Sequence, residues 1–542
     1  MVVEETVPLW KQRANALKEE LDSCIPEEWK LKTSPDSLPL NTINIVSDSG
    51  ILSKEELGII SIDATDLASS IAKKKYTAVE VATAYAKSAA IAHQATNCLS
   101  RFFPKEALER AKWLDEQLQK NGKPVGPLHG VPISVKDHIG LKGQLACIGF
   151  TATIRETIAD SLLVAKLREA GAVFMVKTCV PQAGMQLETD SFRGPTLNPY
   201  NRKHTPGGSS GGEAALIASK GGVLGIGTDI GGSIRNPCAH VGIYGFKPTV
   251  GRVPRTGGDG ISAFYGQDTI LATTGPMGRS IRDLELWITS SIMNEPWKDH
   301  PSVLKMPWRK DEVVFKNGNL PKIGIMWDDG VVRPQPPMRR ALKYTKEKLI
   351  KAGFEVIDVL PYKSAEAWDI TSSLYFSDGG ETNRSNAAKT GEPIWPLTEW
   401  IMTQSTKPRT AAEVMELNLK RDIFRAEYHA YFRTLDIDVM ILPPAPDPAP
   451  RLGTSKYWNY TSLFNLVDYP GGTLPTGLHV ESTDIPDEAY EFTGKSDKEV
   501  WENYNDVNDF VGLPLGIQVV GKKYEDEKVL EAMKLIEEAI RA

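Results

Sequence analysis

The chain has 542 residues, of which 41% are hydrophobic and 24% are charged. This composition is that of a globular protein with ample apolar material for a core, and it excludes a disordered, collagen-like or coiled-coil chain. The 63 basic and 69 acidic residues leave a net charge of −6, so the basic excess expected of a general nucleic-acid-binding protein is missing.

Cysteine usage and local motifs narrow the class further. Five cysteines are too few for a disulfide scaffold in a chain of this length. The sequence contains neither a CxxC nor an HExxH motif, so we predict no metal site. No run of eighteen apolar residues and no apolar N-terminal segment occurs, so we predict neither a transmembrane segment nor a signal peptide. The expectation is a cytoplasmic protein.

The first predicted element is an amphipathic helix that ends before Pro26 and carries its apolar residues at helical spacing: Trp10, Ala14, Leu17 and Leu21. A polar stretch rich in Pro, Ser and Gly follows over 31–50 and is typical of a linker. We therefore predict a helical arm and linker over residues 1–50, followed by a single domain over 51–542.

Helical patterns and short apolar runs then alternate along the chain. Thr77 and Glu80 have the spacing of a capping box, which predicts a helix start there. Another helix is predicted over 162–170, and the last helix near the C-terminus over 529–540. Short apolar runs predict strands at 131–135, 172–176, 323–326, 354–360, 438–442 and 515–520. Strands separated by helices favour an α/β fold with a largely parallel or mixed sheet.

Residues 207–251 hold thirteen of the 45 glycines in the chain. Glycine destabilises the interior of an element by about 0.5–1 kcal/mol relative to alanine, so such a cluster indicates backbone that must approach another group closely. Ser209 and Ser210 lie in GGSSGG, and Ser233 lies in DIGGS. A hydroxyl flanked by glycines is accessible, and the neighbouring N–H groups can point at a bound oxyanion.

Several chemistries use serine in a glycine-rich loop. A phosphate-binding loop is excluded because GxxxxGK[ST] is absent. Residues 207–211 satisfy GxSxG, but the preceding NPYNRKHTP does not form the strand that a nucleophile elbow needs. A serine hydrolase can instead use a buried lysine as its base. A Ser-His-Asp arrangement with His138 or His240 is a further alternative, although no spacing pairs those histidines with a partner.

The stretch TPGGSSGG…LGIGTDIGGSIR…GFKPT resembles the signature of the amidase signature family of serine hydrolases. Further family motifs match at 130–137 (GVPISVKD), 167–174 (LREAGAVF), 188–201 (ETDSFRGPTLNPYN) and 512–521 (GLPLGIQVVG). The resemblance covers about residues 60–540 and is greatest to the fungal acetamidase or general amidase branch, with fatty-acid amide hydrolase as a relative. It implies a large mixed β-sheet sandwiched between α-helices, and no cofactor.

The resemblance also implies residue roles. Ser233 would be the nucleophile, and Lys136 would be the base in its neutral form. Ser209 would relay the proton between them, held by a cis peptide bond with Gly208. The oxyanion hole would consist of the backbone N–H groups of Ile230, Gly231, Gly232 and Ser233. Supporting roles would fall to Ser210, Asp229 and Arg235, and Met185 would line the acyl pocket.

Two further residues and three segments near the site also carry expectations. The family commonly has Lys-Thr-Asn after the strand at 172–176, but this chain has Cys179 in place of the asparagine. We interpret that thiol as a buried, inert group rather than a rival nucleophile. Ser134, two residues before Lys136, is interpreted as a packed or capping serine. Substrate-pocket walls are expected from 254–266, 371–405 and 455–472, whose aromatic residues fit an apolar site or plain core equally well.

The implied function is hydrolysis of carboxylic acid amides through a Ser-Ser-Lys triad and an acyl-enzyme, with a small-molecule amide as the only predicted ligand. A homodimer is left open. One alternative is an A-type subunit of a glutamine-dependent amidotransferase, against which the N-terminal extension weighs. Another is a non-catalytic protein that kept the fold, against which the intact triad positions weigh.

Overall fold

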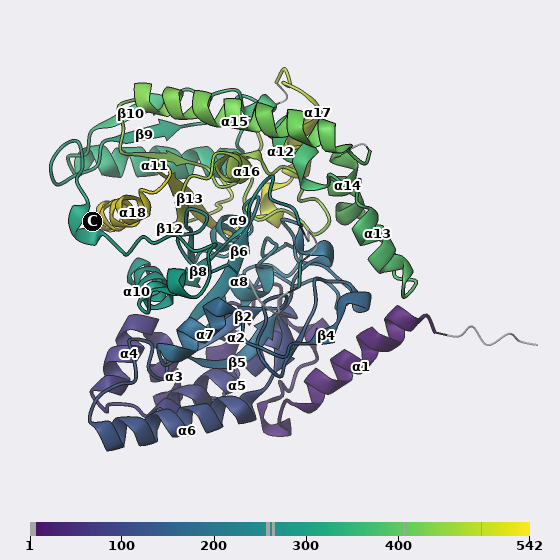
Figure 1. Ribbon diagram of the computed structural model, residues 1–542, viewed down its shortest axis with the longest axis vertical. Coiled ribbons are helices and arrows are strands. Elements are labelled where there is room, and N and C mark those ends of the chain that lie inside the picture. Colours follow the sequence, from purple (N-terminus) through teal and green to yellow (C-terminus); the bar gives the residue numbers. More distant parts are fainter. Residues whose placement is uncertain (1–6, 256–260, 263–265, 406, 489) are drawn as a thin grey trace, which may run out of the picture.

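The fold is that of a computed structural model, which describes residues 7–255, 261–262, 266–405, 407–488 and 490–542. At its centre is an 11-stranded sheet with the strand order β1-β5-β2-β6-β8-β7-β12-β13-β11-β9-β10 (Figure 1). The strands of this sheet are β1 (Leu99–Phe102), β2 (Pro132–Lys136), β5 (Val173–Thr178), β6 (Leu224–Asp229), β7 (Tyr244–Lys247), β8 (Thr273–Gly278), β9 (Ile323–Met326), β10 (Val356–Val359), β11 (Val439–Leu442), β12 (Gly471–His479) and β13 (Pro514–Val520). A separate two-stranded sheet consists of β3 (Leu145–Ala146) and β4 (Arg155–Glu156).

Pairing within the large sheet is mixed, as the sequence predicts. Strand β2 lies parallel to β5 and β6, and β9 lies parallel to β10 and β11. Between these two groups, β8, β7, β12 and β13 join the sheet through antiparallel pairs. The six predicted strands correspond to β2, β5, β9, β10, β11 and β13.

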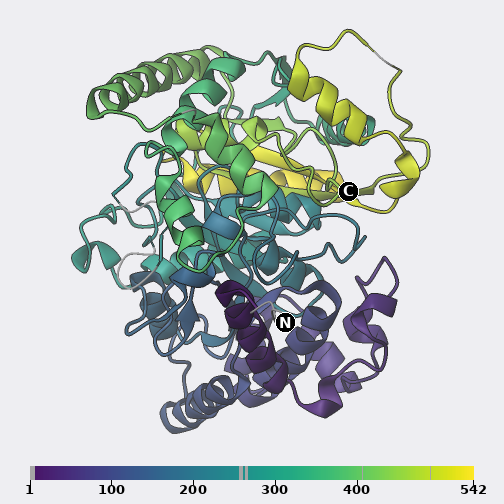
Figure 2. The same cartoon turned by 90° about the vertical axis from the view of Figure 1, so that its right-hand side faces the viewer.

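Helices flank the sheet, which confirms the predicted α/β/α class (Figures 1 and 2). They are α1 (Leu9–Ser23), α2 (Ile45–Asp48), α3 (Lys54–Ser61), α4 (Ala64–Ala72), α5 (Ala78–Thr96), α6 (Pro104–Asn121), α7 (Leu162–Glu169), α8 (Gly211–Ala218), α9 (Arg235–His240), α10 (Ile281–Ile292), α11 (Pro336–Lys351), α12 (Ser364–Tyr375), α13 (Glu381–Ala388), α14 (Pro396–Gln404), α15 (Ala411–Thr434), α16 (Asn459–Leu466), α17 (Lys495–Asn503) and α18 (Asp526–Arg541).

Local sequence signals explain several of these helix boundaries. The predicted capping box forms at the start of α5, where Thr77 Oγ1 accepts from the N–H of Glu80 and the Glu80 carboxylate accepts from the N–H of Thr77. The predicted apolar stripe of α18 is buried through Val529, Met533 and Ile536. This stripe packs on β12, so the last helix of the chain covers part of the central sheet.

The N-terminal helix α1 packs onto the rest of the molecule beside the segment that follows α13, as Figure 1 shows. The ring of Trp10 makes an edge-to-face contact with the ring of Trp395, at 5.9 Å between centroids. The backbone N–H of Trp10 donates to Thr390 O. Leu17 is buried with Cys147 and Phe192. The division into an arm over 1–50 and one domain over 51–542 stays a prediction. Within the described ranges, no helix is both long enough and apolar enough to cross a bilayer.

Candidate active site

The topology of the sheet brings the predicted site residues to the carboxyl ends of neighbouring strands. Strands β2 and β6 are parallel neighbours, so their carboxyl ends lie side by side. Lys136 is the last residue of β2, and Ser233 lies in the turn that joins β6 to α9. Ser209 stands just before α8 and, together with Ser233, lines a cavity of about 140 Å³. The structure thus places Ser209 and Ser233 on one small cavity, with the buried Lys136 in contact with Ser209.

Lys136 is fully buried and lies against two hydroxyl groups. Its Nζ is 2.7 Å from Ser209 Oγ and 2.8 Å from Thr228 Oγ1. Burial disfavours the charged ammonium and lowers the pKa of Lys136 to about 7, although the negative charges of Asp229 and Glu213 oppose this shift. A lysine with such a pKa can accept a proton near neutral pH, which an ordinary lysine cannot do.

Thr228 was missed by the sequence analysis, although strand register could have indicated it. Val135 pairs with Ile226 across β2 and β6, so the next positions bring Lys136 close to residues 227–228. Thr228 also lines the cavity. The glycines of β6 interrupt the apolar pattern that predicts a strand, so its register with β2 could not be derived from the sequence.

Ser134 and Glu213 form a second buried group beside the lysine. Glu213 on α8 is fully buried; it accepts from Ser134 and, at 2.8 Å, from Thr178 Oγ1. Burial raises the pKa of Glu213 to about 7. The interpretation of Ser134 as a packed serine is consistent with this contact. A Cβ at Gly225 would collide with the Glu213 carboxylate, so this glycine leaves room for the acid.

The turn after β6 is held by the carboxylate of Asp229. Asp229 accepts from the N–H of Gly232 at 2.9 Å and from the N–H of Ile234 at 3.1 Å. The N–H of Gly232 is therefore already engaged, which differs from its expected place in the oxyanion hole. Within the described residues, the N–H groups of Ile230, Gly231 and Ser233 donate to no protein acceptor. Three of the four predicted donors remain available beside the cavity.

Two side chains from distant segments fix the carbonyl groups of the same turn. Tyr375 on α12 donates to Ile230 O at 2.8 Å, and Thr461 on α16 donates to Gly231 O at 2.7 Å. Both side chains are buried. Because these donors hold the carbonyl oxygens of Ile230 and Gly231, they fix the orientation of the two peptide groups to which those oxygens belong. No local sequence signal pointed to Tyr375 or Thr461.

Gly232 has a φ of +127°, and a Cβ there would overlap Thr461 Oγ1. We expect Gly232→Ala to lower the free energy of unfolding by about 3 kcal/mol or more, because it adds an overlap to a strained backbone conformation. The matched control is Gly122→Ala, which also has a positive φ but meets no atom within 4 Å and should cost only about 1 kcal/mol. Thermal or denaturant unfolding of the two variants measures the difference. Equal losses would contradict the close contact.

Asp229 and Arg235, both predicted as supporting residues, form a fully buried ion pair. The Arg235 guanidinium donates to both Asp229 oxygens, at 2.9 and 3.0 Å, and also to Gln518 and Asn465. Burial alone would raise the pKa of Asp229, but Arg235 outweighs it and holds that pKa well below its usual range. The carboxylate is therefore charged at neutral pH.

The remaining predicted supporting residues also lie at the site. The peptide bond between Gly208 and Ser209 is cis, as the family resemblance implies. The N–H of Ser210 donates to Ser233 O at 3.2 Å, which ties the two serine loops together. Met185 is buried in an apolar cluster and is not among the residues that line the cavity, whereas its neighbours Ala183 and Gly184 are.

Cys179 and the histidines do not compete for the role of catalytic group. Cys179 is 1% exposed, and burial raises the pKa of its thiol to about 12, so it stays protonated. His138 lines the cavity, but its Nδ1 has no partner among the described residues and no hydrogen bond joins it to a carboxylate there. Burial lowers the pKa of His138 well below its usual value. A Ser-His-Asp relay therefore lacks its acid, and His240 lies at a different cavity.

The expected pocket walls are only partly correct. Segment 254–266 contributes Arg255, Ile261 and Ser262 to the cavity, while 256–260 and 263–265 lie outside the described residues. Neither 371–405 nor 455–472 lines the described part of this cavity. Tyr375, Trp458 and Tyr460 instead pack in the core with exposures of 2% or less, whereas Trp400 and Tyr457 line a different cavity.

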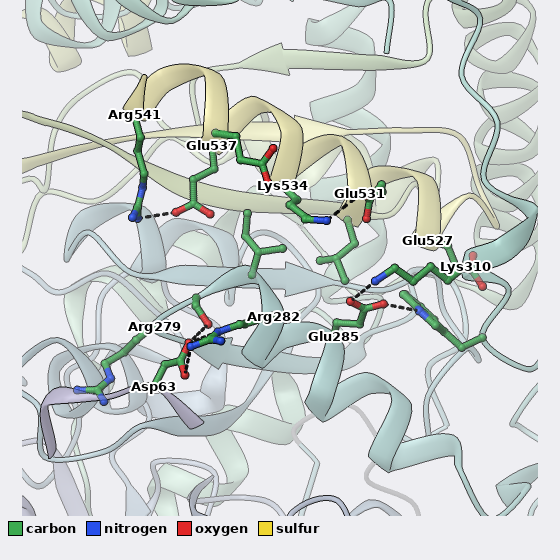
Figure 3. Close-up of a pocket in the computed structure, with 15 residues that line it drawn as sticks. Asp63, Arg279, Arg282, Glu285, Lys310, Glu527, Glu531, Lys534, Glu537 and Arg541 are labelled. Atoms are coloured by element: carbon green, nitrogen blue, oxygen red, sulfur yellow. Dashed lines mark hydrogen bonds and ion pairs between the residues drawn. The ribbon is translucent and has the colours of Figure 1, made fainter. Parts of the chain in front are cut away.

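A larger cavity of about 610 Å³ lies elsewhere, between α10 and α18. Figure 3 shows several pairs of oppositely charged side chains at this cavity. Arg282 binds Asp63, Lys310 binds Glu285, and Arg541 binds Glu537. It contains neither serine of the site described above, so size alone would have pointed to the wrong place.

Comparison with known proteins agrees with this geometry. The family model described as amidase matches residues 80–530. The chain is similar to the acetamidase of Emericella nidulans (38% identity over 536 residues, 96% of each protein) and to that of Aspergillus oryzae (36% identity over 533 residues, 96% of this chain and 97% of the relative). Among solved structures, fatty acid amide hydrolase superposes with a TM-score of 0.92 at 36% identity and covers 98% of this chain and 95% of its own. The chain therefore belongs to the amidase signature family and is an amide-hydrolysing enzyme.

Proposed function

We propose that the chain hydrolyses carboxylic acid amides to an acid plus ammonia or an amine through Ser233, Ser209 and Lys136. The observation that carries this proposal is the 2.7 Å separation of Lys136 Nζ from Ser209 Oγ in a buried site next to the cavity that Ser233 lines. A neutral lysine there has one lone pair, which can accept the hydroxyl proton of Ser209.

In acylation, Ser233 Oγ attacks the amide carbonyl carbon. Its proton passes to Ser209 Oγ, and the proton of Ser209 passes to Lys136 Nζ. The tetrahedral intermediate then expels the amine, which takes a proton back from Lys136 through Ser209, because an unprotonated amide nitrogen leaves poorly. In deacylation, water attacks the ester carbonyl, and the same relay takes up the water proton and returns one to Ser233 Oγ. Lysine is neutral at the start and at the end.

The developing oxyanion would be bound by the N–H groups of Ile230, Gly231 and Ser233. Losing one such donor typically costs about 10²–10³ in rate, so three fixed donors contribute a large share of the barrier reduction. Gly232 supports this arrangement indirectly, because its N–H donates to Asp229 and so shapes the turn.

The size of the cavity favours small substrates. Sites that enclose drug-sized ligands have volumes of about 300–1,000 Å³, whereas this cavity has about 140 Å³. Its apolar lining includes Ile148, Ile230 and Ile261. We therefore infer that short acyl groups are preferred to long chains. The names of the two acetamidase relatives support the same choice.

The amidotransferase alternative is less well supported. Its function would need partner subunits, whereas two relatives that share 96% and 97% of their length with this chain are named acetamidases. Incubating the purified chain alone with short aliphatic, aryl and long-chain amides tests the proposal. We expect ammonia release from short amides without any partner or cofactor. Hydrolysis that requires a second subunit would favour the alternative. The cytoplasmic location and a homodimer stay predictions.

The activity should depend on pH in the direction set by the lysine. Below about pH 7, Lys136 is an ammonium ion and cannot accept a proton. We therefore expect kcat/KM to fall about tenfold for each pH unit below this pKa and to reach a plateau on the alkaline side. Steady-state rates over a pH series, with thermal unfolding at each pH as the control, measure this profile. A profile that is flat from acid to mildly alkaline pH would contradict a lysine base.

Glu213 offers a sharper test because its carboxyl, whose own pKa is about 7, raises the pKa of Lys136 when it is ionised. Glu213→Gln removes that charge and keeps a similar shape. The midpoint of the kcat/KM profile should therefore move to lower pH in this variant. A midpoint that moves upward would show that another group controls the profile.

A further inference from the structure

The small cavity at Ser209 and Ser233 has a marked charge asymmetry. Among the described residues that line it, Arg255 is the one that carries a full charge at neutral pH, and no Asp or Glu is present. His138 is neutral there because burial, together with Lys136 and Lys177, lowers its pKa. The side chains that surround Arg255 at the cavity are apolar, hydroxyl or amide groups. The cavity is therefore electropositive without a counter-charge from the described part of the protein.

Arg255 has no ion-pair partner among the described residues, unlike the arginines nearby in the chain and at the site. Arg235 is paired with Asp229, and Arg252 is paired with both Asp526 and Glu527. Arg255 is partly buried, yet its guanidinium has no hydrogen bond or ion pair within the described ranges. A partly desolvated cation is normally matched by an anion or by acceptors, because losing water without a partner is unfavourable.

A guanidinium presents a planar fork of donors that matches a carboxylate in a two-point contact. We propose that Arg255 binds a carboxylate group of the substrate, so that the preferred substrates are small amides that carry a free carboxylate. This inference rests on the proposed function and deepens it. Because Arg255 and both serines line the same small cavity, only a short spacer of a few carbon atoms fits between the carboxylate and the amide carbonyl.

The carboxylate can belong to the acyl part or to the amine part of the amide, and matched substrates separate the two cases. Succinamate and butyramide differ in the acyl part only, and N-acetylglycine and N-ethylacetamide differ in the amine part only. For each pair, kcat/KM of the charged amide divided by that of the neutral amide gives a selectivity ratio. We expect a ratio of about 10 or more in at least one pair, and the pair that shows it identifies the side of the carboxylate.

The test variant is Arg255→Gln, and the matched control is Arg433→Gln at the exposed end of α15. Arg255→Gln should lower the selectivity ratio by about 10- to 100-fold, the effect of losing a charge-assisted contact. Arg255→Lys should restore part of it. Arg433→Gln should leave the ratio unchanged. Added salt should lower the ratio of the unmodified enzyme more than that of Arg255→Gln.

Two results would overturn the proposal. If neutral amides are hydrolysed but both selectivity ratios stay at or below one and do not respond to Arg255→Gln, the carboxylate site is wrong while the amidase function stands. If no amide is hydrolysed, the proposed function itself fails. Binding of succinamate to the Ser233→Ala variant, measured by calorimetry with and without Arg255→Gln, then tests the site without turnover; equal affinities in the two proteins would overturn it.

Discussion

Replacing Lys136 with alanine is expected to lower kcat/KM by about 10³- to 10⁴-fold, because the buried site then has no general base and no general acid. Lys136 Nζ is the amine in contact with Ser209 Oγ, and the nearby His138 has no carboxylate to support it within the described chain. Pre-steady-state kinetics should show that the loss falls on formation of the acyl-enzyme. Retention of more than a tenth of the normal rate would contradict the assignment.

A control is needed because removing a buried lysine also changes packing. Lys177 on β5 is equally buried, lies beside Asp137 and donates to Leu145 O at 2.8 Å. Lys177→Ala should therefore cost a comparable amount of stability while it keeps the triad in place. We expect its kcat/KM to stay within about tenfold of the normal value, since it removes no reacting group. Similar losses in both variants would mean that packing, not chemistry, explains the effect of Lys136→Ala.

Replacing Ser233 with alanine should have the largest effect, with kcat reduced about 10⁵-fold, because no acyl-enzyme can form. A fluorophosphonate should label the unmodified protein once, and mass spectrometry should place the adduct on Ser233. The Ser209→Ala variant tests whether Ser209 is the proton relay and not the nucleophile. It should lower the rate about 10²- to 10³-fold but still permit slow labelling of Ser233. Labelling of the Ser233→Ala variant at Ser209 would reverse the two roles.

Much of the sheet could be predicted because six of its strands are short apolar runs. The runs at 323–326 and 438–442 are fully buried in β9 and β11, and such runs are characteristic of parallel strands covered on both faces. Helix boundaries followed from capping residues, as at Thr77. These signals are local, so a single sequence contains them in full.

The strands in the middle of the sheet could not be predicted in the same way. Strands β6, β8 and β12 contain glycines where apolar side chains are expected, because neighbouring groups approach their backbone closely. A Cβ at Gly227 would meet Met277, and one at Gly245 on β7 would meet Cys238. The glycine cluster therefore reflects close packing of strands and helix α9 as well as the chemistry of the site, and it hides the usual strand pattern.

The site itself was predictable only as far as its motifs extend. The three residues of the proposed triad lie in glycine-flanked or strand-end motifs, so their positions could be read from the resemblance. Thr228 required the register of two parallel strands, and Tyr375 and Thr461 come from helices more than a hundred residues away. The engagement of the Gly232 N–H by Asp229 depends on the fold of the turn, which no sequence motif specifies.

The protonation state of one buried amine can be measured directly. Lysine-selective ¹⁵N labelling, with the Lys136 signal assigned by its absence in Lys136→Ala, reports the titration of Nζ in the intact enzyme. Burial among hydroxyl groups predicts a midpoint near 7, about three units below that of an ordinary lysine. A midpoint that stays near 10 would mean that this side chain is an ammonium ion throughout the working range, and the proposed proton relay would have no acceptor.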